Sequence, residues 1–405
     1  MNEMVAANLK TTKYRWVVLL VYMYIAALTQ LFWLNFAGID TYMETALHFS
    51  AMKVGMLAAV FPFTFLILSI PAGVVSDRKG YKFAVGIGAI LTGVFAAVRL
   101  FSPYSYLMLF VSQFGISLGQ PFVLNAITKL SVTWFPENED ATAVGFGSLA
   151  LFLGMIVGLG LTPVLVKNFG FVKMLWIYST LTVLGIPLFY IFTKDKPDFP
   201  PRVEETEFEV SYLQGIKNLS KIRDFILLGF VALIGIGVFN GIVTWLEKIL
   251  NELHGISMLK AGNISSILVF SGMLGCIVIP VLSDKLRKRK PFLIVASAVG
   301  IFSVFVLLRG PTYSVQFANA AVFGFFAISI LPLLLAMSAE IAGSRFAGIS
   351  AAYLQLLGNG AAVLIVPLIE VLHRVSGGYA LPLYFIVSLF FVALFLALLI
   401  REPKK

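Results

Sequence analysis

A charged turn, Gly73-Val74-Val75-Ser76-Asp77-Arg78-Lys79-Gly80-Tyr81-Lys82, separates two long apolar segments of this sequence. A shorter copy, Leu282-Ser283-Asp284-Lys285-Leu286, follows another apolar segment, and Asp284 stands 207 positions after Asp77. A pattern that recurs after about half the chain indicates an internal repeat. The turn therefore predicts two related halves, each built around apolar segments.

Two further pairs of segments keep nearly the same spacing. Gly38-Ile39-Asp40-Thr41-Tyr42-Met43-Glu44 is matched 203 positions later by Gly241-Ile242-Val243-Thr244-Trp245-Leu246-Glu247. Arg99 precedes Pro103-Tyr104 as Arg309 precedes Pro311-Thr312-Tyr313. Three matches in register indicate two parallel repeats, an arrangement of transporters that bind their substrate near the membrane midplane between the repeats.

The composition excludes a water-soluble protein. Of the 405 residues, 59% are hydrophobic and 12% are charged, whereas soluble domains have about 45–50% apolar and about 25% charged residues. A membrane-spanning helix needs about 20 mostly apolar residues. Twelve segments meet this length: 16–46, 52–76, 82–101, 104–133, 141–166, 172–193, 223–250, 258–284, 291–309, 312–340, 346–373 and 379–400. We expect an all-α membrane protein with six-helix halves at 1–193 and 223–405, joined by a cytoplasmic linker at 194–222.

The net charge of +10 reflects membrane topology rather than nucleic-acid binding. With both termini in the cytoplasm, 22 of the 30 Lys and Arg residues lie on the cytoplasmic side, as the positive-inside rule requires. We therefore expect a monomeric multi-pass protein of the cell membrane, either plasma or inner membrane. Its partners would be a small-molecule substrate and the lipid bilayer, with no nucleic acid.

Catalytic, metal and cofactor sites are not indicated. The one cysteine, Cys276, excludes a multi-cysteine metal site, and no phosphate-binding G-x-x-x-x-G-K-[ST] loop is present. A membrane enzyme would have to use His48, His254 and His373 with Asp40 and Glu44, all near one predicted membrane face. A receptor is disfavoured because the longest hydrophilic segment resembles only a linker.

The opening turn resembles the loop 2–3 signature of the major facilitator superfamily, G-x-x-x-D-R-x-G-R/K-K/R. The resemblance implies the twelve-helix fold of that superfamily and transport by alternating access. In the superfamily this loop forms a cytoplasmic latch between the halves. The positions that match are Gly73, Asp77, Arg78 and Gly80, with Asp284 as the counterpart in the second half.

Charged residues avoid the middle of the predicted helices. No carboxylate falls in the central third of any predicted span, although proton-coupled carriers usually bury a titratable group along the pathway. Asp40 is the one candidate, either as a coupling residue or as half of an outer-gate salt bridge with Arg99. This pattern favours facilitated diffusion over proton coupling.

Aromatic and neutral polar residues line the predicted interior instead. Trp33 lies near the middle of the first predicted span, where an indole face can bind a cation. Polar residues can equally join helices, and a tryptophan can simply fill a core. The candidate substrate-binding residues are Gln30, Trp33, Asn35, Gln120, Phe152, Asn240, Trp245, Tyr353 and Gln355.

Scattered stretches also resemble the feline leukaemia virus subgroup C receptor-related (FLVCR) family. They include Gln120-Pro121-Phe122-Val123-Leu124, Trp134-Phe135, Gly237-Val238-Phe239, Gly272-Met273-Leu274-Gly275 and Leu331-Pro332. That family is associated with choline and ethanolamine transport and with haem export. Its ammonium site uses a tryptophan, a tyrosine and two glutamines; Trp33 and Gln355 match it, whereas Asn240 and Phe152 replace the tyrosine and the other glutamine.

These observations predict a secondary transporter of a small organic solute, such as a choline-like amine, working by alternating access. The alternatives are a proton-coupled carrier of a neutral or anionic metabolite, and a haem exporter. An anion carrier would be expected to place Arg or Lys at the midplane, where the sequence has none.

Overall fold

The computed structural model describes residues 12–199, 201, 212–343 and 346–402. Within these residues the chain is helical, without a β-strand, and twelve helices are long and apolar enough to cross a membrane. The predicted all-α class and the number of spans are confirmed. Part of the predicted linker, residues 200 and 202–211, lies outside the described residues, as do Lys10, Arg345, Lys404 and Lys405.

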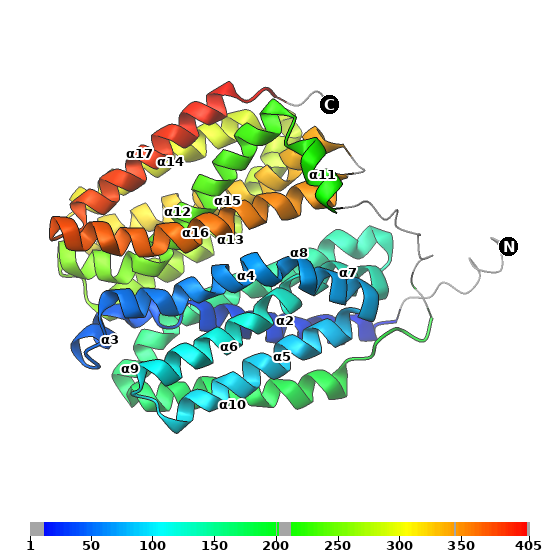
Figure 1. Ribbon diagram of the computed structural model, residues 1–405, viewed down its shortest axis with the longest axis horizontal. Helices are drawn as coiled ribbons and strands as arrows, with labels where there is room; N and C mark the ends of the chain where they lie inside the picture. The colour runs from blue at the N-terminus through cyan, green and yellow to red at the C-terminus, as the bar shows by residue number, and fades with distance from the viewer. Residues whose placement is uncertain (1–11, 200, 202–211, 344–345, 403–405) are drawn as a thin grey trace. The chain divides into compact units, whose positions relative to one another are not determined.

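The helices on either side of the segment between α10 and α11 follow one another with short connections (Figure 1). The first six spans comprise α2 (Tyr14–Leu34), α4 (Ala51–Lys79), α5 (Tyr81–Val98), α6 (Tyr106–Leu124) with α7 (Ala126–Trp134), α8 (Asp140–Ile156) with α9 (Thr162–Phe169), and α10 (Phe171–Phe192). After α11 (Tyr212–Leu219) come α12 (Arg223–His254), α13 (Met258–Leu286), α14 (Lys290–Arg309), α15 (Tyr313–Ala342), α16 (Ala347–Ser376) and α17 (Ala380–Leu399). Val157–Leu161 forms a π-helical turn between α8 and α9.

The first span is shorter than the sequence predicts. Instead of running over 16–46, α2 ends at Leu34, and a 3₁₀ turn (Ala37–Ile39) and the short helix α3 (Asp40–Thr45) follow. Asn35 and Gly38 interrupt the helix because both residue types are poor helix formers. Asp40 therefore lies on a separate helix rather than on a continuous extension of the first span.

The described chain divides into two compact units that do not coincide with the sequence repeats. The first comprises Met1–Asn35 and Thr64–Glu207, and the second comprises Phe36–Phe63 and Phe208–Lys405. Helix α4 begins in the second unit and ends in the first. The division of the chain at the 194–222 linker stays a prediction.

In the first unit, α2 packs against α8 and α6, and α5 packs against α6 and α10. Gly154 permits the close approach of α8 to α2, because a Cβ there would overlap the carbonyl oxygen of Ala27. The core around α2 includes the buried side chains of Val18, Tyr22 and Ala26.

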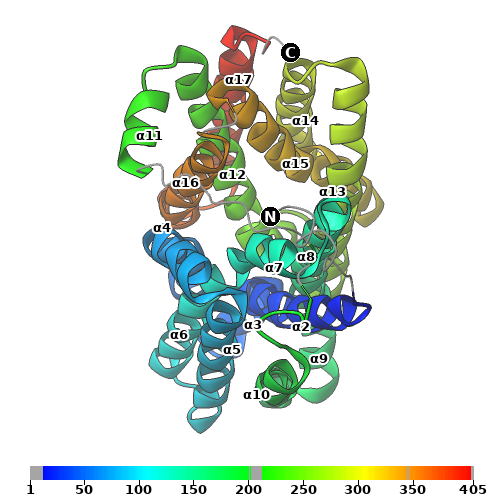
Figure 2. The same cartoon turned by 90° about the vertical axis from the view of Figure 1, so that its right-hand side faces the viewer.

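In the second unit, α13 packs against α15, α12 against α16, and α14 against both α15 and α17 (Figure 2). Residues of the 36–63 segment belong to this packing: the 3₁₀ turn and α3 contact α12. The indole of Trp245 occupies the space beside Gly55 that a side chain there would fill. The second unit therefore includes α3 and the start of α4.

Candidate functional site

Three candidate residues lie close together at the end of α2. Trp33 is in its last turn, rather than at the middle of a longer helix, and its side chain is half-buried. Gln30 is buried and, being three residues earlier, lies on the same face of the helix as Trp33. Asn35 is fully buried, and neither its amide nitrogen nor its amide oxygen has a hydrogen-bond partner in the described structure. The end of α2 thus combines an accessible indole with an unsatisfied amide.

The other two candidates of the first unit lie on helices that pack against α2. Gln120 is buried on α6, one residue before Pro121, and Phe152 is half-buried on α8. The Gly154–Ala27 contact holds α8 directly against α2. Four of the five predicted binding residues of this unit therefore lie on α2 and on the two helices that pack against it, and Asn35 directly follows α2.

In the second unit, Asn240 and Trp245 are both held by hydrogen bonds to backbone carbonyls. Asn240 donates from Nδ2 to the carbonyl of Ile236, 2.8 Å away on its own helix. The indole Nε1 of Trp245 donates to the carbonyl of Val366 at 2.8 Å, and its side chain is fully buried. Trp245 consequently joins α12 to α16 and leaves no indole face for a solute in this conformation.

Tyr353 and Gln355 lie on α16 and are half-buried. The Tyr353 ring stacks on Phe225 of α12, with ring centroids 5.9 Å apart. The backbone carbonyl of Gln355 accepts a hydrogen bond from Asn359. Asn240 and Gln355 are thus on two helices, α12 and α16, that pack against each other.

The charged turn of the signature joins α4 to α5. Asp77 and Arg78 are exposed at the end of α4. Gly80 has φ +84°, a backbone conformation that favours glycine, and α5 begins immediately after it. The glycine in the signature is therefore required by the reversal of the chain.

In the second half, Asp284 belongs to an ionic cluster that the sequence did not predict. Its Oδ1 lies 2.6 Å from Nη2 of Arg289, which also contacts Glu340 Oε1 at 3.0 Å. Burial opposes the charge of Arg289, but the hydrogen bond and charge of Glu340, with Asp284, raise its pKa above the ordinary value. The one sequence signal was Glu340 near the end of an otherwise apolar span.

Arg99 and Asp40 lie in different units. Arg99 is fully buried; its Nη2 donates to Gln113 Oε1 at 2.9 Å, and its guanidinium lies 4.6 Å from the centre of the Phe32 ring. Asp40 is also buried, on α3. The predicted salt bridge between them stays a prediction.

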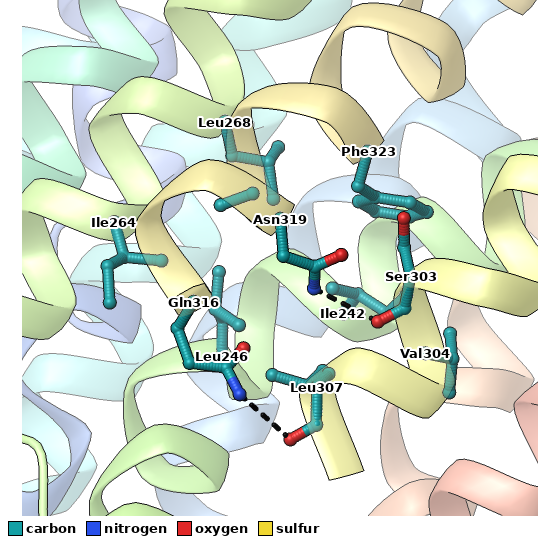
Figure 3. A pocket seen from close by; sticks show the side chains of 11 residues that line it. Ile242, Leu246, Ile264, Leu268, Ser303, Val304, Leu307, Gln316, Asn319 and Phe323 are labelled. Carbon is teal, nitrogen blue, oxygen red and sulfur yellow. Dashed lines mark hydrogen bonds between the residues drawn. The ribbon is translucent and has the colours of Figure 1, made fainter. Parts of the chain in front are cut away.

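A separate pocket lies inside the second unit (Figure 3). Its polar side chains bond to nearby backbone: Asn319 donates to the carbonyl of Ser303 at 3.0 Å, and Gln316 donates to the carbonyl of Gly310 at 2.8 Å. Most of the remaining lining is aliphatic. None of the predicted binding residues lines this pocket, which has the character of packing space between α12, α13, α14 and α15.

Comparison with protein families decides the class of the molecule. The family model described as Major Facilitator Superfamily matches residues 18–367, well over half of the chain. The chain belongs to the Major Facilitator Superfamily. It is therefore a transporter rather than an enzyme and, with its twelve apolar helices, an integral multi-pass membrane protein.

Relatives of this superfamily member include the family suggested by its sequence. It is 26% identical over 368 residues to the human choline/ethanolamine transporter FLVCR2, covering 86% of this chain and 70% of the relative. It is 27% identical over 350 residues to an uncharacterized MFS-type transporter of Caenorhabditis elegans, covering 82% of this chain but only 60% of that relative. The resemblance to the FLVCR family is confirmed.

A solved structure confirms the fold of this superfamily member. A bacterial homolog of the human lysosomal transporter Spinster, in an inward-facing and unoccupied conformation, matches with a TM-score of 0.75. The two chains are 15% identical, and the match covers 96% of each. At this identity the match concerns the fold alone.

Proposed function

We propose that this superfamily member transports a choline-like organic amine that binds against the indole of Trp33. The observation that carries the proposal is the end of α2, where the half-buried indole of Trp33 shares a helix face with the buried amide of Gln30. The relationship to FLVCR2, named a choline/ethanolamine transporter, supports the same class of solute.

The two groups suit the two ends of such a solute. A cation over a tryptophan face gains about 0.5–2 kcal/mol, the higher value applying where water is excluded. The buried Gln30 amide, on the same helix face, can hydrogen-bond to the solute hydroxyl, and a buried polar group that gains a partner avoids a cost of about 1–3 kcal/mol. Asn35 follows Trp33 by two positions, which do not face each other on a helix, so it is kept as a candidate on the sequence pattern alone.

The remaining candidates are assigned on the strength of the family resemblance. We propose that Gln120 and Phe152 in the first unit, and Asn240, Tyr353 and Gln355 in the second, also contribute to solute recognition. Trp245 is left out because its indole is buried and bonded to backbone.

We further propose that the signature residues close the cytoplasmic side during alternating access and that both termini lie on that side. These residues are Gly73, Asp77, Arg78, Gly80 and Asp284. Facilitated diffusion is the proposed mode of transport, because the solute's own positive charge would not require a carboxylate at the indole.

Uptake of radiolabelled choline into proteoliposomes tests the proposal. Trp33→Ala should weaken the apparent affinity for choline about tenfold, as loss of about 1–2 kcal/mol implies, and Trp33→Phe should retain part of it. Trp176→Ala is the matched control, because Trp176 is exposed on α10. Uptake that is absent, or that is unchanged in Trp33→Ala, contradicts the proposal; unlabelled sugars, amino acids and haem as competitors then test the alternative solutes.

A further inference from the structure

An acid-rich cluster lies in the second unit where α3, α12 and α16 meet, apart from the residues proposed to bind the solute. It consists of Asp40 and Glu44 on α3, Glu247, Lys248 and Glu252 on α12, Glu370, His373 and Arg374 on α16, and Tyr379 just before α17. Three of its carboxylates are almost completely buried: Asp40 and Glu247 are 1% exposed and Glu370 is 2% exposed. We call these nine residues the α3–α12–α16 cluster.

Three carboxylates of the cluster have a cationic or imidazole partner. Glu44 lies 2.7 Å from the Lys248 ammonium, which is also 3.8 Å from Glu370. Glu370 accepts a hydrogen bond from Arg374 at 2.8 Å. Glu252 lies 2.9 Å from His373 Nε2. Both permanent positive charges of the cluster are therefore engaged by Glu44 and Glu370.

Asp40 and Glu247 have no such partner within the described residues. Glu247 accepts two hydrogen bonds at 2.9 Å through Oε2, from the backbone NH and from the hydroxyl of Thr41. Its other oxygen, Oε1, has no hydrogen-bond partner in the described structure, and neither has Oδ1 of Asp40. Glu44 Oε1 and Glu370 Oε2 also lack a hydrogen bond but face the Lys248 ammonium, whereas these two buried oxygens of Asp40 and Glu247 have neither kind of partner in the described structure.

The charges of the cluster do not balance. Five carboxylates face two permanent cations, Lys248 and Arg374, so full ionisation leaves a charge of −3, or −2 with His373 protonated. Helix α13, which contacts the 3₁₀ turn before α3, adds no compensating charge nearby, since the ammonium of Lys260 lies over the Tyr313 ring. Glu44 and Glu252 keep contact with solvent, being 26% and 36% exposed, so the uncompensated buried charge is that of Asp40 and Glu247. Unpaired buried charge is costly, and a bound positive charge would remove that cost.

A proton fits this requirement better than a metal ion. Among the described residues, no group of three His, Cys, Asp or Glu side chains is arranged to ligate a metal. The Lys248 ammonium already lies between the carboxylates of Glu44 and Glu370. A proton needs only one unpartnered carboxyl oxygen, which Asp40 and Glu247 each provide.

We propose that Asp40 and Glu247 bind a proton at neutral pH and that this proton keeps α3 docked on α12. Without it, two buried negative charges flank the Thr41–Glu247 hydrogen bonds and repel each other. With it, one negative charge is removed and Thr41 can keep both of its bonds. The inference does not depend on which solute is carried.

The electrostatic surroundings set the direction of the pH dependence. Burial raises the pKa of Asp40 well above its ordinary value, the charges of Glu44 and Glu247 raise it further, and Lys248 opposes them. Because the docked form has the higher pKa, the proton's contribution to docking is complete below the ordinary aspartate pKa. It is lost as the pH rises through the raised pKa of docked Asp40.

Infrared titration of the purified full-length protein, without solute, tests the proton site. The wild-type protein should show a protonated carboxyl C=O band at pH 7 that disappears at higher pH, and Asp40→Asn or Glu247→Gln should remove or shift it. Asp198→Asn is the matched control, because Asp198 is an exposed carboxylate paired with Lys194. A wild-type spectrum without this band at pH 7, or a band unchanged in both cluster variants, overturns the proposal.

Hydrogen exchange of the peptide spanning 36–49 tests the docking of α3. After correction for intrinsic exchange, protection in the wild type should decrease as the pH is raised above neutrality, whereas Asp40→Asn, which cannot ionise, should remain protected. Wild-type protection that does not change with pH overturns the proposal that a proton keeps α3 docked on α12. If sodium or calcium restores the protection that the wild type loses at high pH, and leaves the protection of Asp40→Asn unchanged, a metal ion rather than a proton holds α3 and the proposal is overturned. Both wild-type measurements decide the matter even where a variant fails to fold.

Discussion

At the scale of single residues, buried charge is stabilised differently in the two units. The guanidinium of Arg99 lies over the Phe32 ring and donates to Gln113, whose Nε2 in turn donates to the carbonyl of Phe32 at 2.6 Å. This arrangement ties the end of α5 to α6 and α2 through one amide. Asp40, in contrast, faces an excess of carboxylates. A neutral amide therefore stabilises the buried charge of Arg99 in the first unit, whereas the buried carboxyl groups of Asp40 and Glu247 in the second unit require a proton.

Replacement of Gln113 should reveal the importance of this amide. Gln113→Leu keeps the side-chain size but removes an acceptor from a buried cation and a donor from a buried carbonyl, so we expect a loss of about 2–3 kcal/mol of stability. Thermal unfolding of the detergent-purified protein measures the effect. Gln214→Leu, the same change at an exposed position on α11, is the control; equal melting temperatures for the two variants would contradict this role of Gln113.

At the scale of elements, close helix contacts in the second unit depend on small residues. A Cβ at Gly275 on α13 would overlap the carbonyl oxygen of Phe325 on α15, and one at Gly324 would overlap the carbonyl oxygen of Leu268. Backbone cannot move aside as a flexible side chain can. The α13–α15 pair therefore has two reciprocal contacts that only glycine allows, as is common between membrane helices.

Gly275→Ala should separate α13 from α15 and destabilise the protein by about 1–3 kcal/mol, the usual cost of overpacking. Gly145→Ala should be neutral or stabilising by up to about 1 kcal/mol, because Gly145 is helical, exposed and has open space at its Cβ. Unfolding of both variants under the same conditions provides the comparison. If Gly275→Ala is no less stable than Gly145→Ala, the close contact of α13 with α15 does not contribute to stability as proposed.

The sequence predicted the spans well because hydropathy depends on local composition alone. It did not predict the end of α2 at Leu34, because Phe36, Ala37 and Ile39 continue the apolar run and hydropathy outweighed the weak helix propensity of Asn35 and Gly38. The same break moves Trp33 from the middle of a helix to its end.

The candidate site was predictable to a similar extent. Trp33 and Gln30 were recognised because their residue types are unusual within an apolar span. Glu370 was not predicted as a functional residue, because its contact with Lys248 joins residues 122 positions apart and nothing in their spacing indicates this contact. Contacts between distant segments thus account for what sequence reasoning missed in both the fold and the site.

At the scale of the whole molecule, the distribution of basic residues predicts its orientation in the membrane. The 194–222 linker contains five of the 22 Lys and Arg residues assigned to the cytoplasmic side, whereas Lys53, at the start of α4, is one of eight assigned to the other side. Lys196 and Lys53 are both exposed. In a Cys276→Ser background, which removes the one native thiol, Lys53→Cys should react with a membrane-impermeant maleimide in intact cells. Lys196→Cys should react only after permeabilisation, because positively charged loops are retained in the cytoplasm; the opposite labelling pattern would place the termini, the linker and the charged turn at 73–82 outside the cell.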